Sequence, residues 1–237
     1  MNQIKNAVVI GGTGATGQQL INQLLGNDKW GQITSIGRKP VLNGKSHDKL
    51  QDIVIESLYD LSSTEKLWEG NDVFFNCIGT TRKRAGSAKD FIKVEAGISM
   101  EAAKIASHAK ISHASVISAS GANHNQWAKD WIHPLLYIRT IGQKEQTLIK
   151  NVFDSVSIFR PGMLIRLAGN ETWIERIMKS KGLGLRVDDL ASAMIYDAEK
   201  NRNKLSEKYA SVAYLSNKNI KALIKSLQSN FVEPLVE

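Results

Sequence analysis

One stretch decides the fold: Ala7-Val8-Val9-Ile10-Gly11-Gly12-Thr13-Gly14-Ala15-Thr16-Gly17. Its first four residues form a short apolar run that is typical of a buried strand. The residues Thr16–Gly26 that follow place their apolar side chains on one side of a helix. A glycine-rich turn between a strand and an amphipathic helix is the context in which this glycine spacing binds a dinucleotide. An ordinary flexible βα loop is the alternative interpretation.

Three glycines of the turn have a predicted physical task. We expect Gly12 to allow the tight turn and Gly14 to leave room for a pyrophosphate. Gly17 lets the helix pack closely on the strand. The free N–H groups at the start of the helix then face the anion. The predicted phosphate contacts are Gly11, Gly12, Thr13, Gly14, Ala15, Thr16 and Gly17.

The end of the second predicted strand indicates which nucleotide binds. An NAD site usually places an acidic residue there, on the ribose diol of the coenzyme. This chain has Ile36-Gly37-Arg38-Lys39 instead, with no carboxylate to repel a 2′-phosphate. Arg38 can donate a bidentate pair of hydrogen bonds to that phosphate, and Lys39 adds a point charge. The sequence therefore predicts NADP(H), with Arg38 as the specificity residue, and the alternative is an exposed basic turn.

Short runs of β type alternate along the chain with longer stretches of helical period. Parallel strands need crossover connections, and helical crossovers cover both faces of the sheet. The sequence therefore predicts an α/β fold with a doubly wound parallel sheet. The predicted strands are Asn6–Ile10, Gln32–Gly37, Asp52–Ser57, Asp72–Cys77, His113–Ser118, Ser155–Phe159 and Tyr209–Leu215, and the predicted helices include Thr16–Gly26, Asp90–Ala109 and Ser63–Gly70, the last with Ser62 and Glu65 as a capping box.

The composition is that of one domain. The 237 residues are 42% hydrophobic and 23% charged, so we expect a single domain over residues 1–237. The 31 Lys and Arg residues against 23 Asp and Glu give a net charge of +8, which permits attraction to phosphate. Nucleic-acid binding is the weakest of the interpretations, because no basic stripe with interleaved aromatic residues accompanies the charge.

Cysteine, histidine and hydropathy patterns exclude several classes of site. The single Cys77 excludes an internal disulfide, and the five histidines show no metal-ligand spacing. Cys77 lies in a strand that the sequence predicts to be buried, and no adjacent histidine could activate it. We therefore expect Cys77 to be an unreactive core residue and not a nucleophile. No apolar run is long enough to cross a membrane, and the run Ala7–Ile10 is too short for a signal-peptide core. We therefore expect a cytoplasmic protein.

Five motifs carry a resemblance to a known family over about residues 7–201. The chain resembles the atypical branch of the short-chain dehydrogenase/reductase superfamily, and within it the Tat-interacting-protein-type NADPH-binding oxidoreductases. The resemblance implies a Rossmann fold and a small-molecule substrate, not identified by the sequence. The motifs are Gly11–Gly17, Ile36-Gly37-Arg38, Asn76-Cys77-Ile78-Gly79-Thr80-Thr81-Arg82, Ser118-Ala119-Ser120-Gly121-Ala122 and Phe159-Arg160-Pro161-Gly162.

The same resemblance assigns further positions around the cofactor. It implies a small substrate-facing lobe formed by residues 163–186. The implied cofactor contacts are Asp60 and Leu61 beside the adenine, Gly79, Thr80 and Arg82 along the middle of the cofactor, and Pro161 and Gly162 flanking the nicotinamide.

The resemblance also implies a catalytic Tyr, with a Ser or Thr and a Lys four residues beyond the Tyr. Tyr137 occupies the Tyr position, and either Ser118 or Ser120 the hydroxyl position. The chain departs from the pattern at position 141, where Ile stands in place of Lys.

That departure matters because a Tyr hydroxyl near its ordinary pKa of about 10 is a poor acid–base group at neutral pH. A neighbouring ammonium lowers that pKa, and Ile141 cannot do so. Lys144 is seven residues beyond Tyr137, on nearly the same face and roughly 10 Å along the helix axis. One hypothesis is therefore that the Lys144 ammonium partly replaces the missing Lys in lowering the pKa of Tyr137. The other is that Tyr137 is not catalytic and only packs its helix on the sheet.

Two functions of different classes follow. The first is an NADPH-dependent reductase of a small carbonyl compound, with Tyr137 as the proton donor. The second is an NADP(H)-binding regulatory protein, with a protein partner or a second copy of the chain, in which catalysis is weak or absent because of Ile141. Trp127 and Trp131 either wall an apolar substrate pocket or cover the sheet edge.

Overall fold

A seven-stranded parallel sheet forms the centre of the structure, which is a computed structural model that describes residues 4–167, 184–200 and 211–230. The strand order is β3-β2-β1-β4-β5-β6-β9, and every pair of neighbours is parallel. The strands are β1 (Lys5–Ile10), β2 (Trp30–Gly37), β3 (Leu50–Val54), β4 (Val73–Asn76), β5 (His113–Ile117), β6 (Ser155–Arg160) and β9 (Ser211–Ser216).

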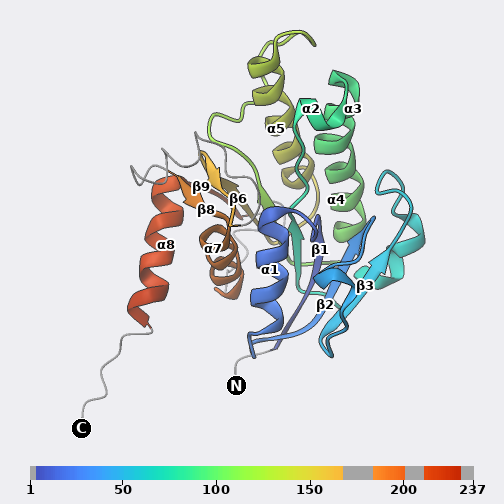
Figure 1. Cartoon of the computed structure of the whole chain (residues 1–237), viewed down its shortest axis with the longest axis vertical. Coiled ribbons are helices and arrows are strands. Elements are labelled where there is room, and N and C mark those ends of the chain that lie inside the picture. The colour runs from blue at the N-terminus through green and yellow to red at the C-terminus, as the bar shows by residue number, and fades with distance from the viewer. Residues whose placement is uncertain (1–3, 168–183, 201–210, 231–237) are drawn as a thin grey trace.

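Helices cover both faces of this sheet (Figure 1). One face packs under α1 (Ala15–Leu25) and α7 (Val187–Glu199), and α8 (Asn217–Asn230) lies beside α7. The other face packs under α4 (Ile98–His108) and α5 (His133–Ile149). Two apolar cores result, one on each side of the sheet. The predicted doubly wound α/β fold is confirmed.

The order of the strands creates a crevice at the carboxyl end of β1. This strand pairs with β2 on one side and with β4 on the other, so the chain changes direction across the sheet at this point. Ligands of open α/β sheets bind at such a switch point. The glycine-rich turn after β1 and the loop after β4 both lie there.

The helical connection between β4 and β5 is more divided than its sequence suggests. The predicted helix Asp90–Ala109 consists of α3 (Ala88–Ile92), one π-helical turn η3 (Lys93–Gly97) and α4. A short helix α2 (Arg82–Ala85) precedes them and is not predicted by the sequence. In Figure 1, α2, α3 and the first turns of α5 extend together beyond the sheet. Ala88, Phe91, Ala128 and Leu136 form a small core of their own there.

The predicted helix Ser63–Gly70 is wrong in type and in its cap. Residues Ser62–Trp68 form a 3₁₀ helix, and Leu61 occupies the N-cap position. The Ser62 N–H donates to the Asp60 carboxylate, so Ser62 does not cap the helix. The Thr64 hydroxyl accepts from the Trp68 indole and donates to the Leu61 carbonyl, and these bonds hold the tighter turn around a buried Trp68.

The segment 163–186 is described only at its two ends. There, β7 (Leu164–Ile165) and β8 (Leu185–Arg186) pair as a two-stranded parallel sheet. The rest of the predicted substrate lobe, residues 168–183, lies outside the described residues. Within the three described ranges, no helix combines the length and the apolar character needed to span a bilayer.

Candidate cofactor and substrate site

The glycine-rich turn leaves β1 through a conformation that only glycine adopts easily. Gly11 has φ +79°, and a Cβ built on it would lie 2.6 Å from the Cys77 backbone. Gly11 therefore makes the tight turn, and the prediction that Gly12 makes it is wrong. Gly12 lacks a side chain for a packing reason, because its Cβ would lie 2.5 Å from Ile21 Cδ1.

The start of α1 has the form of an anion cradle. A Cβ on Gly17 would lie 2.2 Å from the Gly11 carbonyl oxygen, so the missing side chain lets α1 pack closely on the turn that follows β1. Gly14 is the N-cap residue, no side chain caps the helix, and its first turn contains no acidic residue. Thr13, Gly14 and Ala15 are exposed, whereas Thr16 is buried. The N–H groups of a first turn have no partner inside the helix, so this turn fits a diphosphate.

Arg38 and Lys39 lie directly beyond the carboxyl end of β2, next to the crevice. Both side chains are exposed, and Arg38 makes no ion pair with any described residue. Asp60 is also exposed, and hydrogen bonds from Ser62 hold the pKa of its carboxyl below the usual value. The Leu61 side chain is fully buried in the core under α4, which leaves only its backbone to face a ligand.

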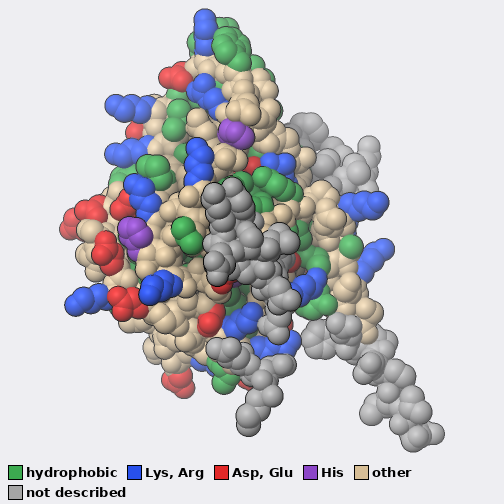
Figure 2. Space-filling view, turned by 180° about the vertical axis from the view of Figure 1, so that it is seen from behind, with side chains coloured by type: hydrophobic (Ala, Val, Ile, Leu, Met, Phe, Trp, Pro, Cys, Tyr) green, Lys and Arg blue, Asp and Glu red, His purple; other side chains and the backbone are tan. Residues whose placement is uncertain are grey.

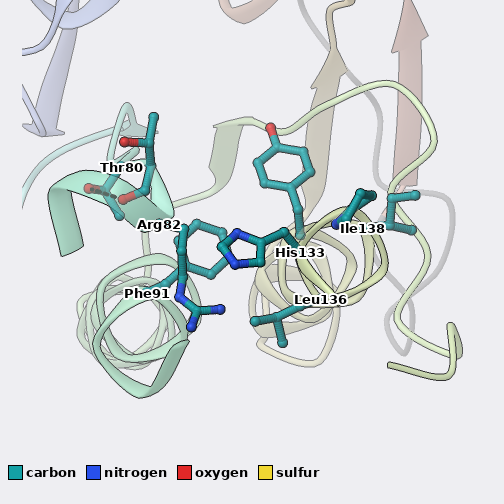
Figure 3. Close-up of a pocket in the computed structure, with 9 residues that line it drawn as sticks. Thr80, Arg82, Phe91, His133, Leu136 and Ile138 are labelled. Carbon is teal, nitrogen blue, oxygen red and sulfur yellow. Dashed lines mark hydrogen bonds between the residues drawn. The ribbon is translucent and has the colours of Figure 1, made fainter. Parts of the chain in front are cut away.

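Tyr137 belongs to the wall of a pocket of ≈410 Å³ between the first turns of α5 and the α2–α3 region (Figure 3). Pro134 lies at the start of α5, where a missing N–H costs nothing. The Tyr137 ring stacks on Phe91 with 6.0 Å between the ring centroids. Burial, and secondarily the charge of Glu95, raise the pKa of the Tyr137 hydroxyl. The lining residues are Thr80, Thr81, Arg82, Phe91, His133, Pro134, Leu136, Tyr137 and Ile138.

The two candidate serines differ in their surroundings. The buried Ser118 hydroxyl donates to Glu145 Oε1 at 2.5 Å, and Arg160 binds the same carboxylate through two nitrogens at 2.7 and 2.6 Å. Ser120 is exposed, its N–H donates to the Pro161 carbonyl at 2.8 Å, and its hydroxyl has no partner among the described residues. Neither serine lines the Tyr137 pocket.

Lys144 is buried and points toward the end of β4. Its ammonium donates to the Ile78 carbonyl and to Glu95 Oε2, the latter at 3.2 Å. Glu95 Oε1 accepts from the Thr80 N–H at 2.6 Å. Ile141, the residue in the Lys position of the family pattern, is buried. Lys144 and Glu95 therefore tie α5 and η3 to the loop after β4.

The remaining predicted residues lie at the same edge of the sheet. Gly79 is exposed beside Thr80, and the Gly162 N–H donates to Asn217 Oδ1 at the start of α8, at 3.0 Å. Pro161 is buried.

Burial raises the pKa of the Cys77 thiol to about 12, so this thiol stays protonated at neutral pH. Among the described residues, no cluster of His, Cys, Asp or Glu side chains could hold a metal ion.

Arg82 lies in the wall of the pocket, as does Thr80. Its Nη1 donates to the Asp130 carbonyl at 2.6 Å, and it lines the pocket together with Phe91 and His133. Figure 3 shows Arg82 among the side chains that line the pocket. The contact between Arg82 and the cofactor that the resemblance implies stays a prediction.

The sheet order, the glycine-rich turn at the switch point and the uncapped start of α1 define a Rossmann-fold dinucleotide-binding protein. The chain belongs to the NAD(P)H-binding family, whose model matches residues 11–200. The predicted kinship with the Tat-interacting-protein-type oxidoreductases is confirmed by its relatives.

Two of these relatives match about two thirds of this chain. The Rattus norvegicus protein HTATIP2 is 29% identical over an alignment that covers 69% of this chain and 64% of that protein. The mitochondrial protein FMP52 of Debaryomyces hansenii is 31% identical over 68% of this chain and 67% of that protein. The chain thus spans about two thirds of the length of the relatives that it matches.

Solved structures show the same fold at low sequence identity. The Bordetella bronchiseptica enzyme WbmH in complex with NAD⁺ has a TM-score of 0.65 and 14% identity, and the match covers 99% of this chain and 84% of that one. The oxidoreductase ylbE from Lactococcus lactis has a TM-score of 0.63 and 17% identity, with 94% and 97% covered.

The relatives correct the expected location. The predicted cytoplasmic location is overturned by the FMP52 proteins of Debaryomyces hansenii and Candida albicans, which are named mitochondrial. That expectation rested on the lack of a signal-peptide core and of a membrane span, and neither feature tests for import into mitochondria. On the face that Figure 2 shows, Lys and Arg side chains are scattered and do not gather in one stripe.

Proposed function

We propose that the protein is an NADP(H)-dependent reductase of a small carbonyl compound. This proposal rests on one observation: the uncapped start of α1 and the pocket that contains Tyr137 lie at the same edge of the sheet. When bound, the coenzyme would supply the hydride. Its diphosphate would rest on the N–H groups of Thr13 and Ala15–Gly17, since the Gly14 N–H donates to the Gly11 carbonyl at 3.0 Å. Arg38 with Lys39 would hold the 2′-phosphate.

The chain's own residues would bind the carbonyl and supply the proton. The raised pKa of Tyr137 keeps its hydroxyl protonated at neutral pH, which suits a proton donor in the direction of reduction but makes it a weak acid. Neither serine lines the pocket, so a serine would contact only a substrate that reaches beyond these walls. Of the two, Ser120 would donate to the carbonyl oxygen, because no described residue engages its hydroxyl, whereas the Ser118 hydroxyl donates to Glu145. Lys144 and Glu95 would hold the loop Ile78–Thr80 in place against the coenzyme.

Replacing Tyr137 with phenylalanine tests the proton donor. We expect the turnover of NADPH with the best substrate from a panel of aldehydes, ketones and quinones to fall by about 100-fold or more, because the proton donor is lost. The exposed Tyr59 is the matched control, and Tyr59→Phe should leave turnover unchanged. NADPH affinity should be the same in all three proteins. An active wild type whose turnover survives Tyr137→Phe would contradict the role of Tyr137.

Replacing Arg38 with alanine tests the coenzyme. In titrations followed by tryptophan fluorescence, we expect the wild type to bind NADPH at least tenfold more tightly than NADH, because a charged hydrogen bond contributes roughly 1.5–3 kcal/mol. Arg38→Ala should remove the preference by weakening NADPH alone. Lys104→Ala, at an exposed cation on α4, is the control that should keep it. Equal affinities of the wild type for both coenzymes would overturn the assignment of NADP(H).

A second candidate function is an NADP(H)-binding regulatory protein. It is favoured by the buried Ile141 in the Lys position and by the raised pKa of Tyr137, since coenzyme binding survives the loss of proton transfer. Coenzyme occupancy would then present or hide a surface that binds a protein partner or a second copy of the chain. Pull-downs that recover the same proteins with and without NADPH, from an extract containing all candidate partners, would contradict this function.

A further inference from the structure

The pocket at Tyr137 has a chemical character that points to a class of substrate. We propose that it binds a flat, apolar carbonyl compound that carries a carboxylate, and that Arg82 binds this carboxylate. The proposal rests on the proposed function, because it names the substrate of the same site. It assigns to Arg82 a specificity role toward the substrate instead of a contact with the coenzyme.

The apolar part of the proposal comes from the floor and sides of the pocket. Phe91 and Leu136 are only 2% and 1% exposed, so their side chains form a rigid apolar floor. The Phe91 and Tyr137 rings lie at an interplanar angle of 27°, and Pro134 and Ile138 extend the apolar wall along α5. A volume of ≈410 Å³ lies in the usual range of small-molecule sites, roughly 300–1,000 Å³. Aromatic walls of this kind favour a flat ring that stacks against them.

The charged part comes from Arg82. None of the residues that line the pocket is acidic, and Arg82 makes no ion pair with any described residue. Its Nη1 is used by the Asp130 carbonyl, while its Nε is buried without a hydrogen-bond partner. Its Nη2 donates to no described residue, so this nitrogen can donate to an acceptor of a ligand. A carboxylate matches the fork of a guanidinium, with two parallel hydrogen bonds.

The guanidinium is held in place before any ligand binds. The connection between β5 and α5 is fixed at two carbonyls, because Arg82 binds that of Asp130 and Arg139 Nη1 binds that of Ala128 at 2.8 Å. His133 lines the same pocket as Arg82 (Figure 3). A preorganised cation above an apolar floor distinguishes an anionic ligand from its neutral analogue.

The test compares two probes that differ in charge and by one methyl group, 3-(1,4-naphthoquinon-2-yl)propanoate and its methyl ester. Their dissociation constants are measured by calorimetry on the full chain, both without coenzyme and saturated with NADP⁺, so that no turnover occurs. We expect the acid to bind at least about tenfold more tightly than the ester. Arg82→Met should abolish this preference, and Arg82→Lys, which keeps the charge without the fork, should retain part of it. Lys83→Met is the control at an exposed neighbouring cation and should keep it fully.

Equal binding of the acid and the ester to the wild type would overturn the proposal, and this comparison needs no variant that might fail to fold. A preference that survives in folded Arg82→Met would overturn the role of Arg82. Weaker binding of NADPH to Arg82→Met, with the acid preference intact, would return Arg82 to the coenzyme. If the acid binds through Arg82 but NADPH does not bind, this proposal stands and the proposed reductase function fails.

Discussion

Replacing Lys144 with methionine is expected to lower the free energy of unfolding by about 3–5 kcal/mol, the cost of removing one partner of a buried ion pair. Both Lys144 and Glu95 have side chains only 2% exposed, so the carboxylate would be left uncompensated in the core. The Ile78 carbonyl would lose its donor as well. Because domains of this size are stable by only about 5–15 kcal/mol, the change would be a large share of the total.

Urea denaturation followed by circular dichroism measures this loss. Lys104→Met, at an exposed lysine on α4, is the matched control and should change the free energy of unfolding by less than about 0.5 kcal/mol. Adding Glu95→Gln to Lys144→Met should restore part of the stability, since the neutral amide no longer needs a counter-charge and still accepts from the Thr80 N–H. A loss below about 1 kcal/mol in Lys144→Met would show that the buried pair is not formed in solution.

Local sequence patterns predicted the parts of the fold that local physics determines. The apolar run before Gly11, the glycines, and the amphipathic period of Thr16–Gly26 predicted β1, the turn and α1, with bounds that differ by one residue at each end of the helix. The alternation of strands and helices predicted the parallel sheet, because parallel strands require crossovers. The absence of a carboxylate beside Arg38 is likewise visible in the sequence alone.

The polar contacts of the candidate site depend on tertiary structure and were not predicted. Glu95 lies in a stretch whose period resembles one regular helix, but a π-helical turn redirects its side chain inward to Lys144 and Thr80. Such turns occur frequently at functional sites, and sequence periodicity does not reveal them. Glu145 and Arg160 come together from α5 and β6, which are separated in sequence and brought together only by packing. A pair of adjacent charged residues within a helix that packs on the sheet, Lys144 and Glu145, was the available signal.

Gly14→Asp separates coenzyme binding from folding. Gly14 has φ −74° and ψ 164°, a conformation that any residue adopts, and its Cβ would lie 3.2 Å from the Gly11 carbonyl oxygen, a contact that a shift of a few tenths of an ångström relieves. Aspartate is among the best N-cap residues, so the free energy of unfolding should stay within about 1 kcal/mol of the wild type. The same carboxylate would stand where the diphosphate is proposed to bind, and like charges so close cost several kcal/mol.

The central claim is that the N–H groups at the start of α1 hold the diphosphate of the coenzyme, and calorimetric titration of NADPH into the wild type and Gly14→Asp tests it most directly. We expect saturable binding to the wild type and binding that is weaker by about 100-fold or more to Gly14→Asp. Gly14→Asn, which has the same shape without the charge, should bind with an affinity between the two. Undiminished NADPH binding by a folded Gly14→Asp protein would contradict the account.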